Sequence, residues 1–126
     1  MVDAILSFHR MFGYAVIVLN ALAGLYALAA WRWKQLRGRW VWISTIVAEV
    51  AILVQIVAGT IVVATHKELA KQNGIRFHMF YGFVAFLTVG IAYQYRSSMR
   101  GRLEMFYGLV GLFLMGVGIR AVMQVA

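Results

Sequence analysis

Hydrophobic residues form four long blocks, and short polar stretches separate them. The blocks cover residues 11–31, 40–65, 77–95 and 103–125. A helix rises about 1.5 Å per residue, so about 20 apolar residues cross the roughly 30 Å hydrocarbon core of a bilayer. Lipid offers backbone amides no hydrogen-bond partner, which excludes open strands from these blocks. The pattern therefore predicts four transmembrane helices.

The helices extend slightly beyond the apolar blocks. We predict them at about 3–33, 40–66, 75–95 and 103–125. Short connections make successive helices antiparallel neighbours. The expected fold is all-α: an integral membrane, up-down-up-down four-helix bundle that forms one transmembrane domain over residues 1–126. In such a bundle the first and third helices run parallel and sit on one diagonal.

Composition supports this class. The 126 residues are 63% hydrophobic, whereas globular proteins are about 45–50% apolar. The sequence contains no cysteine, which excludes disulfides, thiolate metal sites, iron–sulfur clusters and the attachment of c-type haem. It also contains no proline, so no helix carries a proline kink.

The net charge of +8 is concentrated in two of the three loops. Cations fill the first and third loops, whereas in the middle loop they are offset by Glu68. This is the pattern of cytoplasmic loops in membrane proteins. We therefore expect a multi-pass protein of the cell (plasma) membrane with the N-terminus and C-terminus outside, in contact with the lipid bilayer and not with nucleic acid. The cations of the two loops are Arg32, Lys34, Arg37, Arg39, Arg96, Arg100 and Arg102.

A short motif occurs twice. Residues 8–14 read Phe-His-Arg-Met-Phe-Gly-Tyr, and residues 77–83 read Phe-His-Met-Phe-Tyr-Gly-Phe. Both copies begin a helix that is predicted to run from outside to inside. The repeat indicates a duplicated helical hairpin, and the alternative is coincidence among apolar residues.

The repeat places His9 and His78 at matching depth on the diagonal helices. Ionisable groups inside a membrane are costly and often functional. Two imidazoles that face each other across a bundle core can ligate a haem iron from both sides. Gly13 and Gly82 follow their histidines by four residues, on the same helix face, and would let a flat macrocycle approach the backbone. The alternatives are interfacial or hydrogen-bonding histidines, and glycines that permit close helix packing.

Other polar residues map to the same outer end. Arg10, Arg76 and Arg120 would suit the two haem propionates, because a guanidinium group binds carboxylates through a planar fork. The alternative is that they extend toward lipid head groups. His66 closes the second helix, where an interfacial role is favoured, although it could replace one ligand or line the site.

Polar residues deeper in the membrane are few. Glu49 could relay protons or couple transport, but we favour a structural pairing with a tyrosine or a basic loop residue. Asn20 and Gln55 are expected to hydrogen-bond between helices. Three glycines near one face of the fourth helix predict close packing, inside the bundle or against a partner subunit: Gly108, Gly111 and Gly118.

Several of these residues together resemble a known family. His9-Arg10 opens one helix, residues 53–62 read Leu-Val-Gln-Ile-Val-Ala-Gly-Thr-Ile-Val in the next, and His78 opens a third. This resembles one four-helix half of haem A synthase over about residues 8–95, and more broadly the four-helix membrane b-type cytochromes. The resemblance implies that His9 and His78 are axial ligands of a b-type haem. The chain corresponds to one half only, and Asp3 alone precedes His9 as an acidic residue, so we do not extend the synthase activity to it.

The sequence thus predicts a membrane b-type cytochrome with a single bis-histidine haem b near the outer face. It would serve electron transfer as a subunit or partner of a respiratory complex, rather than as a self-contained enzyme. One haem near one face does not carry electrons across a membrane, so a quinol, other membrane subunits or a homo-oligomer is implied. The alternatives are a haem-free accessory subunit and a small oligomeric transporter that uses Glu49. Neither alternative requires two matched histidines.

Overall fold

The computed structural model describes residues 2–125, and this part of the chain contains helices and no strand. The long helices are α1 (Val2–Arg32), α2 (Arg39–Thr65), α3 (Ile75–Tyr95) and α4 (Leu103–Met123). Short 3-10 turns connect them: η1 (Lys34–Leu36), η2 (Lys67–Lys71) and η3 (Arg96–Met99). The prediction of an all-α chain with four long helices is confirmed, and each helix end lies within two residues of its predicted position.

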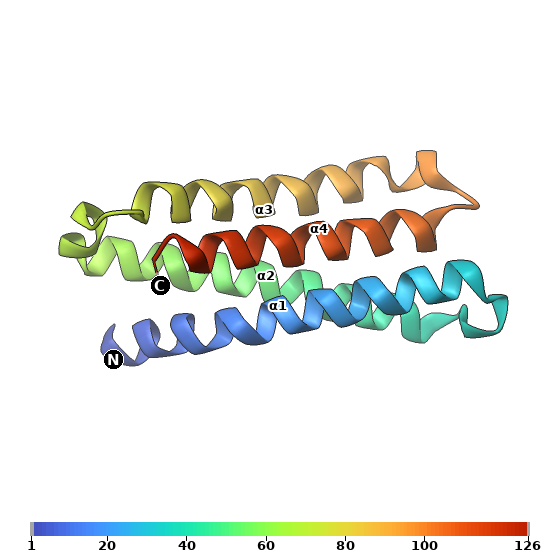
Figure 1. The fold of residues 1–126 in the computed structure, drawn as a ribbon, viewed down its shortest axis with the longest axis horizontal. Coiled ribbons are helices and arrows are strands. Elements are labelled where there is room, and N and C mark those ends of the chain that lie inside the picture. Colours follow the sequence, from blue (N-terminus) through green and yellow to red (C-terminus); the bar gives the residue numbers. More distant parts are fainter. Residues whose placement is uncertain (1, 126) are drawn as a thin grey trace.

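Consecutive helices run in opposite directions, and the two termini lie at the same end of the molecule (Figure 1). α1 packs mainly against α4 and α2, and α3 packs mainly against α4. α1 and α3 therefore lie on one diagonal, whereas the neighbours α2 and α3 contact each other only sparsely. Just before α3, Gly74 adopts a left-handed conformation with φ of 83°, which glycine tolerates because it has no Cβ atom.

α1 and α4 approach closely because glycines line both sides of their contact. A Cβ atom added to Gly111 would lie 2.8 Å from the Cα of Gly24. One added to Gly108 would lie 2.5 Å from Cγ of Leu28, and one on Gly118 would lie 2.8 Å from a side-chain carbon of Ile17. The glycine stripe of α4 therefore packs inside the bundle, which decides between the two alternatives that the sequence left open.

Two polar side chains tie α1 to the rest of the bundle. Asn20 is almost completely buried and donates hydrogen bonds to Val16 O at 2.9 Å and, on α2, to Ala48 O at 3.3 Å. Arg37 donates to Ala30 O at 2.8 Å and to Trp31 O at 2.9 Å. The predicted interhelical role of Asn20 is confirmed, and Arg37 satisfies carbonyls at the end of α1 that have no partner within the helix.

Large apolar side chains cover the outside of the bundle. Met11, Phe77 and Ile46 expose 75%, 63% and 61% of their surface. The core between the helices is built mainly from small and medium-sized residues, among them Val16, Ala51, Ile52, Ala85, Leu114 and Val117. All four helices are long and apolar enough to cross a membrane. An apolar exterior of this extent is compatible with contact to lipid and suggests a multi-pass membrane protein.

Candidate functional site

His9 of α1 and His78 of α3 meet across the diagonal of the bundle. Their ring centroids lie 5.9 Å apart, and the ring planes are at 86° to each other. His9 is in the third turn of α1, whereas His78 is at the end of the first turn of α3, so α1 continues further past the pair at this end of the bundle than α3 does. Because the two rings lie side by side, the two histidines are nevertheless at the same depth in the bundle, as the repeated motif predicts.

The His78 ring is held in place by α4. Its Nδ1 atom lies 2.7 Å from Ala121 O. A carbonyl oxygen only accepts hydrogen bonds, so Nδ1 carries the proton and donates it to Ala121 O. This leaves the lone pair on Nε2. A histidine whose Nδ1–H is bound by a backbone carbonyl is typical of metal-ligating imidazoles, because the bond sets both the tautomer and the ring orientation.

The His9 ring packs against α2 at Gly59. A Cβ atom on Gly59 would lie 2.7 Å from Cε1 of His9, so any larger residue would displace the ring. Sequence reasoning did not single out Gly59 as a site residue. Gly59 lies in the segment 53–62 that contributes to the resemblance, but a glycine within an apolar helix does not indicate a contact with His9, because such glycines are common in membrane proteins.

Gln55 of α2 lies one turn before Gly59 and also contacts α1. Its Nε2 atom donates a hydrogen bond of 2.6 Å to His9 O, which confirms the predicted interhelical role of Gln55. Gln55 Oε1 and His9 Nδ1 are both buried, and neither has a hydrogen-bond partner in the described part of the chain. Leaving such an atom unsatisfied costs about 1–3 kcal/mol. Buried polar atoms without a partner are rare in proteins, which makes these two candidates for contact with a bound group or water.

The two glycines of the repeated motif have different surroundings. A Cβ atom on Gly82 would meet nothing within 4 Å, so there is open space beside α3 one turn from His78. One on Gly13 would lie 3.0 Å from Gln55 Nε2, so Gln55 fills the space beside α1. The space beside Gly13 is therefore taken by Gln55, whereas the space beside Gly82 is open. A cofactor role for either glycine stays a prediction.

The three predicted propionate-binding arginines lie close in sequence to the histidines or to the residue that binds His78. Arg10 follows His9, Arg76 precedes His78 by two residues, and Arg120 precedes the residue whose carbonyl binds His78. All three side chains are exposed. The Cζ atom of Arg120 lies 6.0 Å from the centre of the Tyr81 ring, which orients its guanidinium group beside α3. Their role with propionates also stays a prediction.

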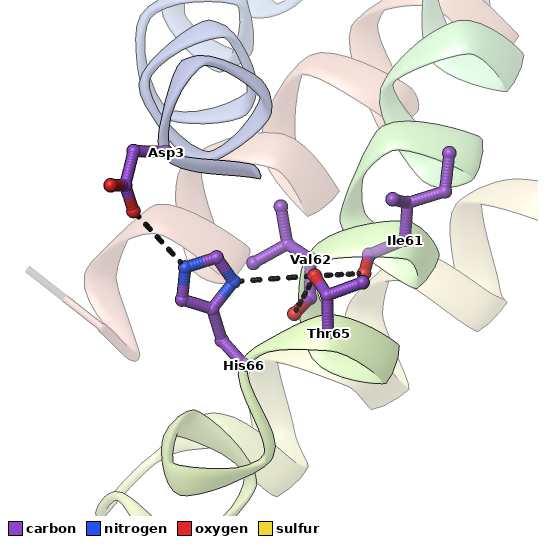
Figure 2. Close-up of polar contacts among 5 residues, drawn as sticks. All are labelled: Asp3, Ile61, Val62, Thr65 and His66. Atoms are coloured by element: carbon purple, nitrogen blue, oxygen red, sulfur yellow. Dashed lines mark hydrogen bonds and ion pairs between the residues drawn. The ribbon is translucent and has the colours of Figure 1, made fainter. Parts of the chain in front are cut away.

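His66 makes contacts apart from the pair (Figure 2). Its Nε2 atom lies 3.4 Å from Asp3 Oδ1, and its Nδ1 atom lies 3.3 Å from Thr65 Oγ1. Asp3 does not cap α1, because the helix begins at Val2; its carboxylate approaches His66 instead. Since Asp3 is 98% exposed, this contact contributes at most about 1 kcal/mol. The interfacial role favoured for His66 agrees with these contacts.

Glu49 lies apart from the histidines, on α2 between Ala48 and Val50. Its carboxyl group is half-buried, and its Oε2 atom has no hydrogen-bond partner among residues 2–125. The structural pairing that the sequence favoured is therefore not formed at this oxygen.

Within residues 2–125, no group of three or more histidine, aspartate or glutamate side chains is arranged to hold a metal ion. A haem requires only axial ligands from the protein, because the macrocycle supplies the other nitrogens. No family model, curated protein or solved structure matches this chain. The resemblance to haem A synthase therefore stays a prediction made from the residues, and the geometry of the histidine pair carries the functional argument.

Proposed function

We propose that this protein is a membrane b-type cytochrome that holds one haem b between His9 and His78. The observation that carries the proposal is the meeting of two imidazole rings from diagonal helices, with centroids 5.9 Å apart, together with the hydrogen bond that His78 Nδ1 donates to Ala121 O. The protein would serve electron transfer as a subunit or partner of a respiratory complex.

The ring separation suits an iron between two imidazoles. An iron held by both imidazoles would require the two rings to lie close together across the bundle. The observed centroid distance is 5.9 Å. Donation from His78 Nδ1 leaves Nε2 as the ligating atom.

The surroundings of the pair also suit this cofactor. The open space at Gly82 leaves room for a flat ring one turn from His78. Arg10, Arg76 and Arg120 would bind the two propionates through charge-assisted hydrogen bonds. A bound haem would supply a one-electron couple at its iron. The chain itself would set the potential through two neutral imidazole ligands, the hydrogen bond at His78 and an apolar environment.

The proposed arrangement in the membrane follows from the loop charges. The helices would cross the plasma membrane up-down-up-down, with the basic first and third loops in the cytoplasm and both termini outside. The haem would then lie near the outer face. Because one haem in that position does not span the bilayer, its electrons would come from a quinol or pass to another membrane subunit.

Three single variants test the histidine pair. We expect His9→Ala and His78→Ala to abolish the b-type α-band in the reduced-minus-oxidised spectrum of protein purified with haem supplied. His66→Ala is the matched control and should retain the band, because His66 contacts Asp3 and Thr65 rather than the pair. Gel filtration and circular dichroism would show that each variant is folded. Retention of the band in both variants of the pair would refute the proposal.

A further inference from the structure

A groove of about 360 Å³ lies between α2 and α3, where these neighbouring helices contact each other sparsely. Its wall is apolar apart from the Glu49 carboxyl and the Tyr93 hydroxyl. The residues that matter here are Ile46, Glu49, Leu53, Phe86, Gly90 and Tyr93. Ile46, Phe86 and Tyr93 each expose at least half of their surface, so the groove opens sideways, toward the lipid that would surround the bundle.

Glu49 is the one acidic residue of this groove, and it lacks a partner. Its Oε2 atom is buried without a hydrogen bond in the described chain. Glu49 follows the start of α2 at Arg39 by ten residues, or about 15 Å along the axis, so its short side chain does not reach water at the helix end. A carboxylate at this depth is costly unless a counter-charge or a hydrogen-bond donor meets it.

The cation nearest to the groove in sequence, Arg96, already lies over one of the rings that line it. Arg96 donates a 2.6 Å hydrogen bond to Tyr93 O, and its Cζ atom lies 3.7 Å from the centre of the Tyr93 ring. No ion pair joins Glu49 to a basic residue within the described range 2–125. Within residues 2–125 the carboxyl group therefore has no counter-charge in ion-pair contact.

We propose that the α2–α3 groove binds a lipophilic monovalent cation, an ammonium group on an apolar body, with Glu49 as its counter-charge. The carboxylate supplies the opposite charge. Phe86 supplies an aromatic ring, and such rings attract cations by about 2 kcal/mol where water is excluded; the Tyr93 ring already faces Arg96. The aliphatic wall receives the apolar body. A volume near the lower end of the usual range for ligand pockets, about 300–1,000 Å³, indicates a small molecule.

The proposal does not depend on the haem. Glu49 and Gly59, which touches the His9 ring, are ten residues apart on α2, or about 15 Å along the helix. Loss of the groove's ligand and loss of the α-band are therefore separate outcomes, and Glu49→Gln should leave the α-band unchanged.

The test uses the full chain in detergent and two fluorescent probes that differ only in the head group. One is a dansyl-labelled undecylammonium ion, and the other is the corresponding undecyl alcohol. We expect saturable binding of the ammonium probe, and binding of the alcohol that is at least about tenfold weaker. Glu49→Gln should weaken ammonium binding by about tenfold or more, whereas Glu68→Gln, in the exposed turn η2, should not change it.

A second variant tests the groove without touching the carboxyl group. A Cβ atom on Gly90 would meet nothing within 4 Å, so Gly90→Leu should fold, fill the groove and weaken ammonium binding by a similar factor. Equal binding of the alcohol would overturn the assignment of a cation. Undiminished binding by Glu49→Gln would show partition into detergent. A wild-type dimer that Glu49→Gln dissociates would show a second copy in the groove. Undiminished binding by Glu49→Gln and dissociation of a dimer would each overturn the proposal as well.

Discussion

Gly59 is the residue of α2 that admits the His9 ring. A methyl group at this position would lie 2.7 Å from Cε1 of His9, well inside van der Waals contact. We expect Gly59→Ala to shift the ring away from His78 and to lower the affinity for haem by about tenfold or more, because ligand geometry tolerates only small displacements. A titration of the purified protein with haem, followed by absorbance, measures this.

The matched control is Gly116→Ala on α4, where an added Cβ atom would meet nothing within 4 Å. The same substitution there should leave haem affinity unchanged, and it should stabilise the helix by up to about 1 kcal/mol, because alanine has the higher helix propensity. Equal haem affinities for both variants would contradict the packing of His9 on Gly59.

At this scale the sequence predicts some residues and not others. His9 and His78 stand out because a repeated motif places them at the same depth on parallel helices. Gln55 and Gly59 became part of the site only in the structure. Their roles depend on which face α2 turns toward α1, and a helix that is apolar on all sides carries no polar stripe from which to read that rotation.

The close contact between α1 and α4 depends directly on glycine residues. A Cβ atom on Gly111 would lie 2.8 Å from Gly24 Cα, and backbone atoms do not move aside as a flexible side chain does. We expect Gly111→Ala to destabilise the bundle by about 1–3 kcal/mol, in the range of overpacked cores. Unfolding by SDS in mixed micelles, followed by circular dichroism, gives the difference in free energy of unfolding.

Gly116→Ala on the same helix again serves as the control, because it adds the same methyl group to open space. If Gly111→Ala were as stable as this control, the close contact between α1 and α4 would not contribute to stability.

The helix limits could be predicted to within two residues because charged, polar loops bound each apolar block. The unequal packing of the helices could not be predicted from the sequence. Small residues on α4 predict a close contact, but they do not say that the contact is with α1. Nor could the sequence predict the sparse contact between α2 and α3, and thus the groove at Glu49, because the hydrophobic pattern treats these two helices alike.

For the whole molecule, the distribution of charge leads to a test of orientation. The natural chain contains no cysteine, so single cysteines can be introduced without background. Asn73 precedes α3, Ser98 lies in η3, and both are exposed. With both termini outside, a membrane-impermeant maleimide added to intact cells should label Asn73→Cys and not Ser98→Cys. Labelling of both after the membrane is permeabilised controls for reactivity, and the reverse pattern would place the histidines near the cytoplasmic face.

The central claim is that the His9–His78 pair holds a haem. The most direct test is the reduced-minus-oxidised visible spectrum of the wild-type protein, purified in detergent after expression with haem supplied. Our account predicts a b-type α-band at a stoichiometry of about one haem per chain, as expected for one bis-histidine site. A well-folded, haem-supplied preparation without that band would contradict it.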